Sequence, residues 1–117
     1  MIDWKAIIVG FLVSVILGTL LGFIIPLFGG LISTLLAGIL VGYMAKGSIG
    51  NGALNGTIMG ILSRIVESII LIYIGYALID TAGLLLVGIG IIFVILMALI
   101  HILIAAIGGV IGSAISN

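Results

Sequence analysis

The chain has 117 residues, of which 65% are hydrophobic and 5% are charged, and its formal net charge is zero with the histidine neutral. Six charged side chains cannot cover the surface of a soluble domain of this length, so the composition predicts an integral membrane protein. Three scattered basic residues offer no surface for nucleic acid, and the absence of cysteine excludes disulfides and cysteine-ligated metals.

The first apolar run covers about residues 5–25 and follows Asp3 and Trp4, which form an interfacial anchor together with Lys5. The run is too long for the apolar part of a signal peptide, and no Ala-x-Ala cleavage pattern follows it, so we expect a retained membrane span. Pro26 ends this span, because proline cannot continue the hydrogen-bond ladder of a helix.

Three further apolar runs follow. The second covers about residues 29–45, which is short for a bilayer that takes roughly 20 residues of helix to cross. The polar, glycine-rich break Ala45–Asn51 separates it from the third run, about residues 52–79, and a turn at Asp80–Gly83 leads to the fourth, about residues 84–115. The runs are apolar at successive positions, whereas strands of a membrane barrel alternate polar and apolar residues, so we predict helices.

We therefore predict an all-α fold in which residues 1–117 form a single transmembrane domain, with four transmembrane helices in two antiparallel hairpins. Cytoplasmic loops are rich in lysine and arginine, and Lys5 and Lys46 fall on the same side of the membrane in this arrangement. Both termini are therefore predicted to be cytoplasmic, with the protein in the cell membrane and Asp80 on the outer side.

Small residues four apart recur along the predicted helices. This spacing places them on one helix face, and in lipid such faces let helices pack closely. The predicted helix-packing residues are Gly10, Ser14, Gly18, Gly22, Gly30, Thr34, Gly38, Gly42, Gly52, Gly56, Gly60, Ala105, Gly108 and Gly112. The faces can pack within one four-helix bundle or at the seam of a homo-oligomer.

Arg64, Glu67 and His101 are predicted to lie near the middle of the third and fourth spans. Ionisable groups at this depth are costly and usually have partners, and Arg64 and Glu67 are spaced to meet on one helix surface. His101 comes from the neighbouring span and can join them. Three interpretations stay open: a buried ion pair with a hydrogen-bonded histidine that fixes helix alignment, a polar path or binding site for protons, ions or a small polar solute, and a docking site for another membrane subunit.

Motifs of enzymes are absent from the sequence, which has no phosphate-binding loop, nucleophile elbow, zinc-protease motif or paired carboxylates. The predicted loops are also too short to build a site outside the membrane. We therefore expect no enzyme activity, no cofactor and no metal.

Four glycine-rich stretches carry a further signal: Gly38–Tyr43, Lys46–Ser48, Gly52–Gly56 and Gly108–Gly112. In these stretches the chain resembles a family of small archaeal membrane proteins described only as a domain of unknown function. The resemblance implies four membrane spans and no established activity, and it transfers no functional residue.

These observations favour a non-enzymatic structural or accessory protein of the lipid bilayer, either self-associated as a homo-oligomer or bound within a larger membrane assembly. The alternative is a minimal channel or transporter subunit that uses Arg64, Glu67 and His101 as a polar site at the middle of the membrane. A third interpretation, a lipid-organising protein, rests on the short second span.

Overall fold

The structure is a computed structural model that describes residues 1–26, 28–78 and 81–116, with the side chains of all of these except residues 71, 74–78 and 81–87. In this part of the chain there are four helices: α1 (Trp4–Ile24), α2 (Gly29–Ala45), α3 (Ile49–Leu78) and α4 (Thr81–Ser116). The all-α prediction is therefore confirmed for the described residues. The predicted position of Asp80 lies outside them.

Two helices begin earlier than the predicted spans. Helix α3 begins at Ile49, because the Ser48 hydroxyl accepts a hydrogen bond from the Asn51 amide at 3.1 Å and so caps the helix. Helix α4 begins at Thr81, so residues 81–83, which were predicted to belong to a turn, are helical. The helix therefore extends three residues before the apolar run, although Thr81 and Gly83 have low helix propensity.

Three described helical segments are long and apolar enough to cross a membrane: Trp4–Ile24, Ile49–Ile70 and Gly88–Ser116. Helix α2 is also apolar but has only 17 residues. Length and composition therefore indicate a membrane protein. A crossing by α2 stays a prediction.

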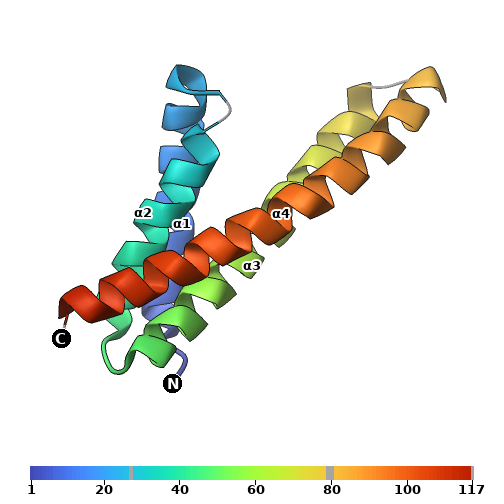
Figure 1. Ribbon diagram of the computed structural model, residues 1–117. Helices are drawn as coiled ribbons and strands as arrows, with labels where there is room; N and C mark the ends of the chain where they lie inside the picture. Colours follow the sequence, from blue (N-terminus) through green and yellow to red (C-terminus); the bar gives the residue numbers. More distant parts are fainter. Residues whose placement is uncertain (27, 79–80, 117) are drawn as a thin grey trace.

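The helices form two arms that meet at one end of the molecule (Figure 1). We call α1 with α2 the short arm and α3 with α4 the long arm. The arms cross near the end that holds both termini and the α2–α3 loop, and they diverge toward the other end (Figure 1). Helix α2 packs against the three other helices, whereas α1 and α4 share no contact in the described residues.

The core lies at this crossing and is made of small and medium-sized side chains. Its fully buried hydrophobic residues are Ala6, Ile7, Ala37, Val41, Met59 and Ala105. Glycines bring the helix backbones into contact around it. A Cβ atom added at Gly38 would lie 2.6 Å from the Ala105 carbonyl oxygen, and one added at Gly108 would lie 2.6 Å from the Leu35 carbonyl oxygen. A larger residue at either position would therefore push α2 and α4 apart.

Asn55 fastens the segment before α1 to helix α3. Its side chain is fully buried, and its Oδ1 accepts a hydrogen bond from the Asp3 amide at 2.7 Å. Its Nδ2 donates to the carbonyl oxygens of Met1 at 3.1 Å and Asn51 at 2.8 Å. One side chain thus satisfies backbone groups from two separate parts of the chain, which aligns α1 with α3.

The α2–α3 loop turns sharply at Lys46 and Gly47, whose φ angles are 55° and 97°. Glycine adopts positive φ without steric cost, but lysine does so with strain. The Ser113 hydroxyl donates a hydrogen bond to the Ser48 carbonyl oxygen at 2.8 Å. This bond ties the last turns of α4 to the loop and closes the crossed end of the molecule.

Candidate functional site

Arg64 and Glu67 form an ion pair on α3, with Arg64 Nη2 and Glu67 Oε1 2.6 Å apart. They lie three residues apart, which places both side chains on neighbouring positions of one helix surface. The Arg64 side chain is 18% exposed and the Glu67 side chain is 34% exposed. The buried Arg64 Nε atom has no hydrogen-bond partner among the described atoms. The pair is therefore only partly covered by its own chain.

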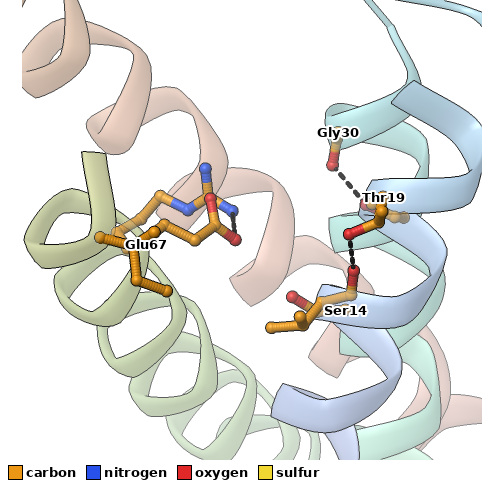
Figure 2. A pocket seen from close by; sticks show the side chains of 9 residues that line it. Ser14, Thr19, Gly30 and Glu67 are labelled. Atoms are coloured by element: carbon orange, nitrogen blue, oxygen red, sulfur yellow. Dashed lines mark hydrogen bonds and ion pairs between the residues drawn. The ribbon is translucent and has the colours of Figure 1, made fainter. Parts of the chain in front are cut away.

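Glu67 faces a groove of about 340 Å³ between the short arm and α3, which we call the inter-arm groove (Figure 2). Besides the ion pair, the groove is lined by three hydroxyl side chains, two glycines and two aliphatic residues: Ser14, Thr19, Ser33, Gly18, Gly30, Val15 and Ile70. Figure 2 shows Glu67 projecting from α3 toward Ser14 and Thr19 on α1. The polar groups of both arms thus face one another across the groove.

A smaller cavity of about 100 Å³ lies on the other side of the ion pair. It is lined by Arg64, Glu67, Ser68, Phe93, Val94, Met97 and Ala98. The ion pair therefore borders both the inter-arm groove and this cavity between α3 and α4.

The hydroxyl groups of the inter-arm groove donate to partners within the chain. Ser14 Oγ donates to Ser63 Oγ at 3.3 Å, Thr19 Oγ1 to the Val15 carbonyl oxygen at 2.9 Å, and Ser33 Oγ to the Gly30 carbonyl oxygen at 2.9 Å. Each of these hydroxyl groups therefore donates its hydrogen bond within the chain. The oxygen lone pairs stay available as acceptors, so the α1 and α2 side of the groove suits a group that donates hydrogen bonds.

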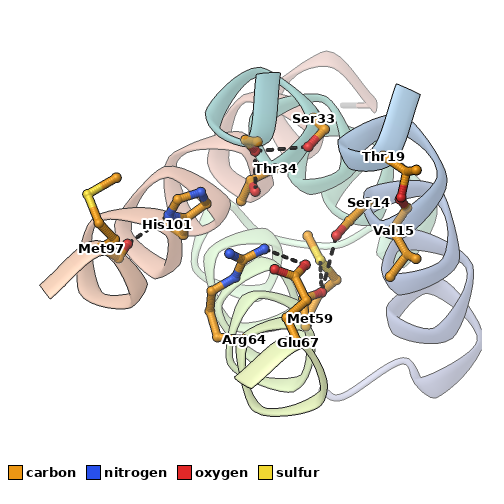
Figure 3. Close-up of polar contacts among 12 residues, drawn as sticks. Ser14, Val15, Thr19, Ser33, Thr34, Met59, Arg64, Glu67, Met97 and His101 are labelled. Carbon is orange, nitrogen blue, oxygen red and sulfur yellow. Dashed lines mark hydrogen bonds and ion pairs between the residues drawn. The ribbon is translucent and has the colours of Figure 1, made fainter. Parts of the chain in front are cut away.

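His101 does not join the ion pair. Its Nδ1 lies 2.7 Å from the Met97 carbonyl oxygen, one turn back on α4, and its side chain is nearly buried. A carbonyl oxygen can only accept, so Nδ1 carries the proton and Nε2 faces Gly30 of α2. Figure 3 shows the ring beside α4, with no hydrogen bond drawn to Arg64 or Glu67. The structure therefore separates the three ionisable groups into a pair and a histidine that packs between α4 and α2.

The predicted helix-packing residues fall into two groups. A Cβ atom added to most of the glycines would touch another helix: Gly10, Gly38, Gly42, Gly52, Gly56, Gly60, Gly108 and Gly112. Ala105, Ser14 and Thr34 are also buried. A Cβ atom added at Gly18 would lie 3.3 Å from the Ser33 hydroxyl of α2, and one added at Gly30 would lie 3.3 Å from His101 Nε2 of α4. A Cβ atom added at Gly22 would meet no described atom within 4 Å. Among the predicted residues, the closest backbone contacts lie at the crossed end, and the Cβ side of Gly22 is open.

Two residues of the inter-arm groove, Thr19 and Ser33, were not singled out in the sequence. Both are polar residues inside otherwise apolar runs, which is the signal that could have found them. In the described residues no group of three His, Cys, Asp or Glu side chains is placed to hold a metal ion.

Fold and site together describe a small helical membrane protein with an ion pair exposed to a groove between two arms. The sequence model of DUF5518, a family of unknown function, matches residues 4–115, and the chain belongs to this family. No curated protein and no solved structure matches the chain. The family carries no assigned activity, and the archaeal source that the resemblance implied stays a prediction.

Proposed function

We propose that the protein is a non-enzymatic structural or accessory protein of the cell membrane that acts as a homo-oligomer or within a larger membrane assembly. All four helices cross the bilayer, in two hairpins packed through small residues, with both termini in the cytoplasm. The protein uses no cofactor and binds no nucleic acid. Its partners are lipid and other membrane helices.

The observation that carries this proposal is the open space on the Cβ side of Gly22. A Cβ atom added at Gly22 would meet no described atom within 4 Å and one added at Gly18 would meet only the Ser33 hydroxyl, whereas one added at Gly56 or Gly108 would contact the backbone of another helix. Glycine is costly in a helix unless a neighbouring helix uses the space, by about 1 kcal/mol relative to alanine in water. In lipid that loss is offset when another helix packs closely. Helices from outside the chain would supply this contact along the diverging arms.

The mass of the protein particle in a lipid nanodisc tests the proposal. Native mass spectrometry should show several copies of the 12.0 kDa chain, or one copy with another membrane protein. Gly22→Leu should reduce this association, because a Cβ atom at Gly22 meets no described atom of its own chain within 4 Å, whereas a large side chain there blocks close approach by another helix. Gly50→Leu is the matched control, since Gly50 has one neighbour, the Ser48 hydroxyl at 3.8 Å, and lies outside the arms' open end. A particle with a single chain and no other protein would overturn the proposal.

A second candidate function, a minimal channel or transporter subunit, is favoured by the inter-arm groove itself. The groove combines an ion pair at the middle of α3 with hydroxyl groups of α1 and α2, which is the composition of a polar solute site in a membrane. If this function holds, liposomes with the wild-type protein should show a pH-dependent flux that Glu67→Gln abolishes while assembly is unchanged. The structural proposal predicts no flux from either protein.

A further inference from the structure

We infer that the partner is a second copy of this chain, which packs on the inter-arm groove so that the two Arg64–Glu67 pairs meet across a two-fold axis. The inference rests on the proposed self-association and adds the face and the geometry of the contact.

The Arg64–Glu67 pair is only partly buried by its own chain, and at its depth in the membrane it requires further contact with protein. Arg64 and Glu67 lie near the middle of the 30-residue helix α3, and the Glu67 side chain is 34% exposed toward the groove. The groove wall around it is itself exposed, with Val15 at 37% and Ile70 at 52%. In a bilayer the surroundings at this depth are hydrocarbon, and charged groups there almost always face protein or a water-filled space. A protein surface over the groove would meet this requirement.

The charges of the groove favour a copy of the same chain over a ligand of one sign. Arg64 and Glu67 add to zero, so the groove does not attract an anion or a cation specifically. Arg64 has five N–H donors and makes one hydrogen bond to Glu67 in the described chain. Glu67 likewise has acceptor capacity left. A second Arg–Glu pair complements both residues, because it offers a carboxylate to Arg64 and a guanidinium group to Glu67.

The geometry of the pair makes it complementary to itself. Arg64 and Glu67 lie about 60° apart around α3, because three residues turn a helix through about 300°. Their head groups are bonded and therefore lie at one level. A two-fold axis along the membrane normal reverses the left-to-right order of the facing copy, as in any isologous contact. Arg64 of each copy then faces Glu67 of the other, and the four groups form a ring of alternating charge.

The shape of the groove fits this arrangement. On its α1 side lies Gly18, where an added Cβ would meet only the Ser33 hydroxyl, at 3.3 Å. On its α3 side Ile70 projects and is half exposed. A large aliphatic side chain opposite glycine is the packing by which helices approach closely in membranes. The two-fold axis places Ile70 of each copy on the glycine side of the other.

Exchanging the two charges tests the ring directly. The double variant Arg64→Glu/Glu67→Arg keeps an ion pair within each chain and forms an alternating ring with another double variant. Against a wild-type chain, however, it places arginine opposite arginine and glutamate opposite glutamate. Two differently tagged chains are co-expressed in every combination, and the amount that co-purifies is measured. We expect matched pairs to co-purify equally and the mixed pair to fall at least about tenfold, since facing like charges are strongly unfavourable.

The outcomes separate this inference from the proposed function. If matched and mixed pairs co-purify equally, the chains associate through another face and the inference is overturned, while self-association stands. If no combination co-purifies and the nanodisc particle contains one chain, both fail.

Cysteine cross-linking supplies an independent measurement should the double variant not fold. The chain has no cysteine, so the introduced ones are the only thiols present. A chain with Ile70→Cys, co-expressed with a differently tagged chain that carries Gly18→Cys, should give a disulfide-linked heterodimer in membranes, because the two-fold axis places Ile70 opposite the glycine side of the other copy. Ile69→Cys with the same Gly18→Cys chain is the matched control, because Ile69 is 61% exposed but lies about 200° around α3 from Glu67. We expect at least about tenfold more heterodimer from Ile70→Cys, whose cross-link needs the facing geometry of an isologous contact. Equal cross-linking at both positions would overturn the inference.

Discussion

Gly56 lies at a direct backbone contact between helices α3 and α4, so we expect Gly56→Ala to destabilise the protein. A Cβ atom added at Gly56 would contact the Ala105 carbonyl oxygen, and it would lie 3.1 Å from Gly109 Cα and 3.3 Å from the Ala105 carbonyl carbon. All three atoms belong to the backbone of α4. None can rotate away, so α3 and α4 must move apart to admit the methyl group.

The size of the effect follows from two opposing contributions. Overpacking a close-packed contact costs about 1–3 kcal/mol, and a contact made only by backbone atoms belongs at the upper end, about 3 kcal/mol. Alanine regains about 1 kcal/mol of helix propensity over glycine. The expected net loss in the free energy of unfolding is therefore about 2 kcal/mol, or roughly a 30-fold change in the ratio of folded to unfolded protein.

Gly22→Ala is the matched control, because a Cβ atom at Gly22 meets no described atom within 4 Å. It should leave stability unchanged or raise it by up to about 1 kcal/mol. Both variants are compared with the wild-type protein by titrating SDS into mixed micelles and following unfolding by circular dichroism. If Gly56→Ala were as stable as Gly22→Ala, the close approach of α3 and α4 would not contribute to stability, and the packing argument would be refuted.

Three further predictions concern single polar or strained groups. Asn55→Leu should leave the Asp3 amide and the Met1 carbonyl oxygen without this partner and lower the free energy of unfolding by about 1–3 kcal/mol for each. Hydrogen exchange at the Asp3 amide should become faster, and unchanged exchange there would contradict the role of Asn55. Lys46→Gly should stabilise the protein by about 1 kcal/mol in the same SDS titration, because lysine at φ 55° and ψ 175° is strained where glycine is not. A loss of stability would show that contacts of the lysine side chain contribute more than the strain costs. The nitrogen chemical shifts of His101 should show a protonated Nδ1 and an unprotonated Nε2 when the ring is neutral, and the opposite tautomer would exclude its bond to the Met97 carbonyl oxygen.

The helices could be predicted because the signals that delimit them are local. The polar break between Ala45 and Asn51 separates two apolar runs, and Pro26 ends the first. The predicted starts of α3 and α4 are less accurate. Ser48 belongs to the predicted break, but its hydroxyl caps α3, so that helix begins at Ile49.

The candidate site could be predicted in part, for a similar reason. The Arg64–Glu67 contact depends on spacing along one helix, which the sequence states directly. The groove depends on the angle at which the short and long arms cross, and nothing local in the sequence sets that angle. The same is true of His101, which lies at the expected place on α4 but packs toward Gly30 rather than toward the ion pair.

The length of α2 has a consequence for the lipid around the protein. Its 17 residues span about 25 Å, while the hydrocarbon layer of a typical bilayer is about 30 Å thick. The long arm has no such deficit, since α3 has 30 residues and α4 has 36. If α2 crosses the membrane as we propose, the bilayer must become thinner beside α2 and not beside α3 and α4, so we expect the protein to favour membrane regions where the thickness changes over the width of one molecule.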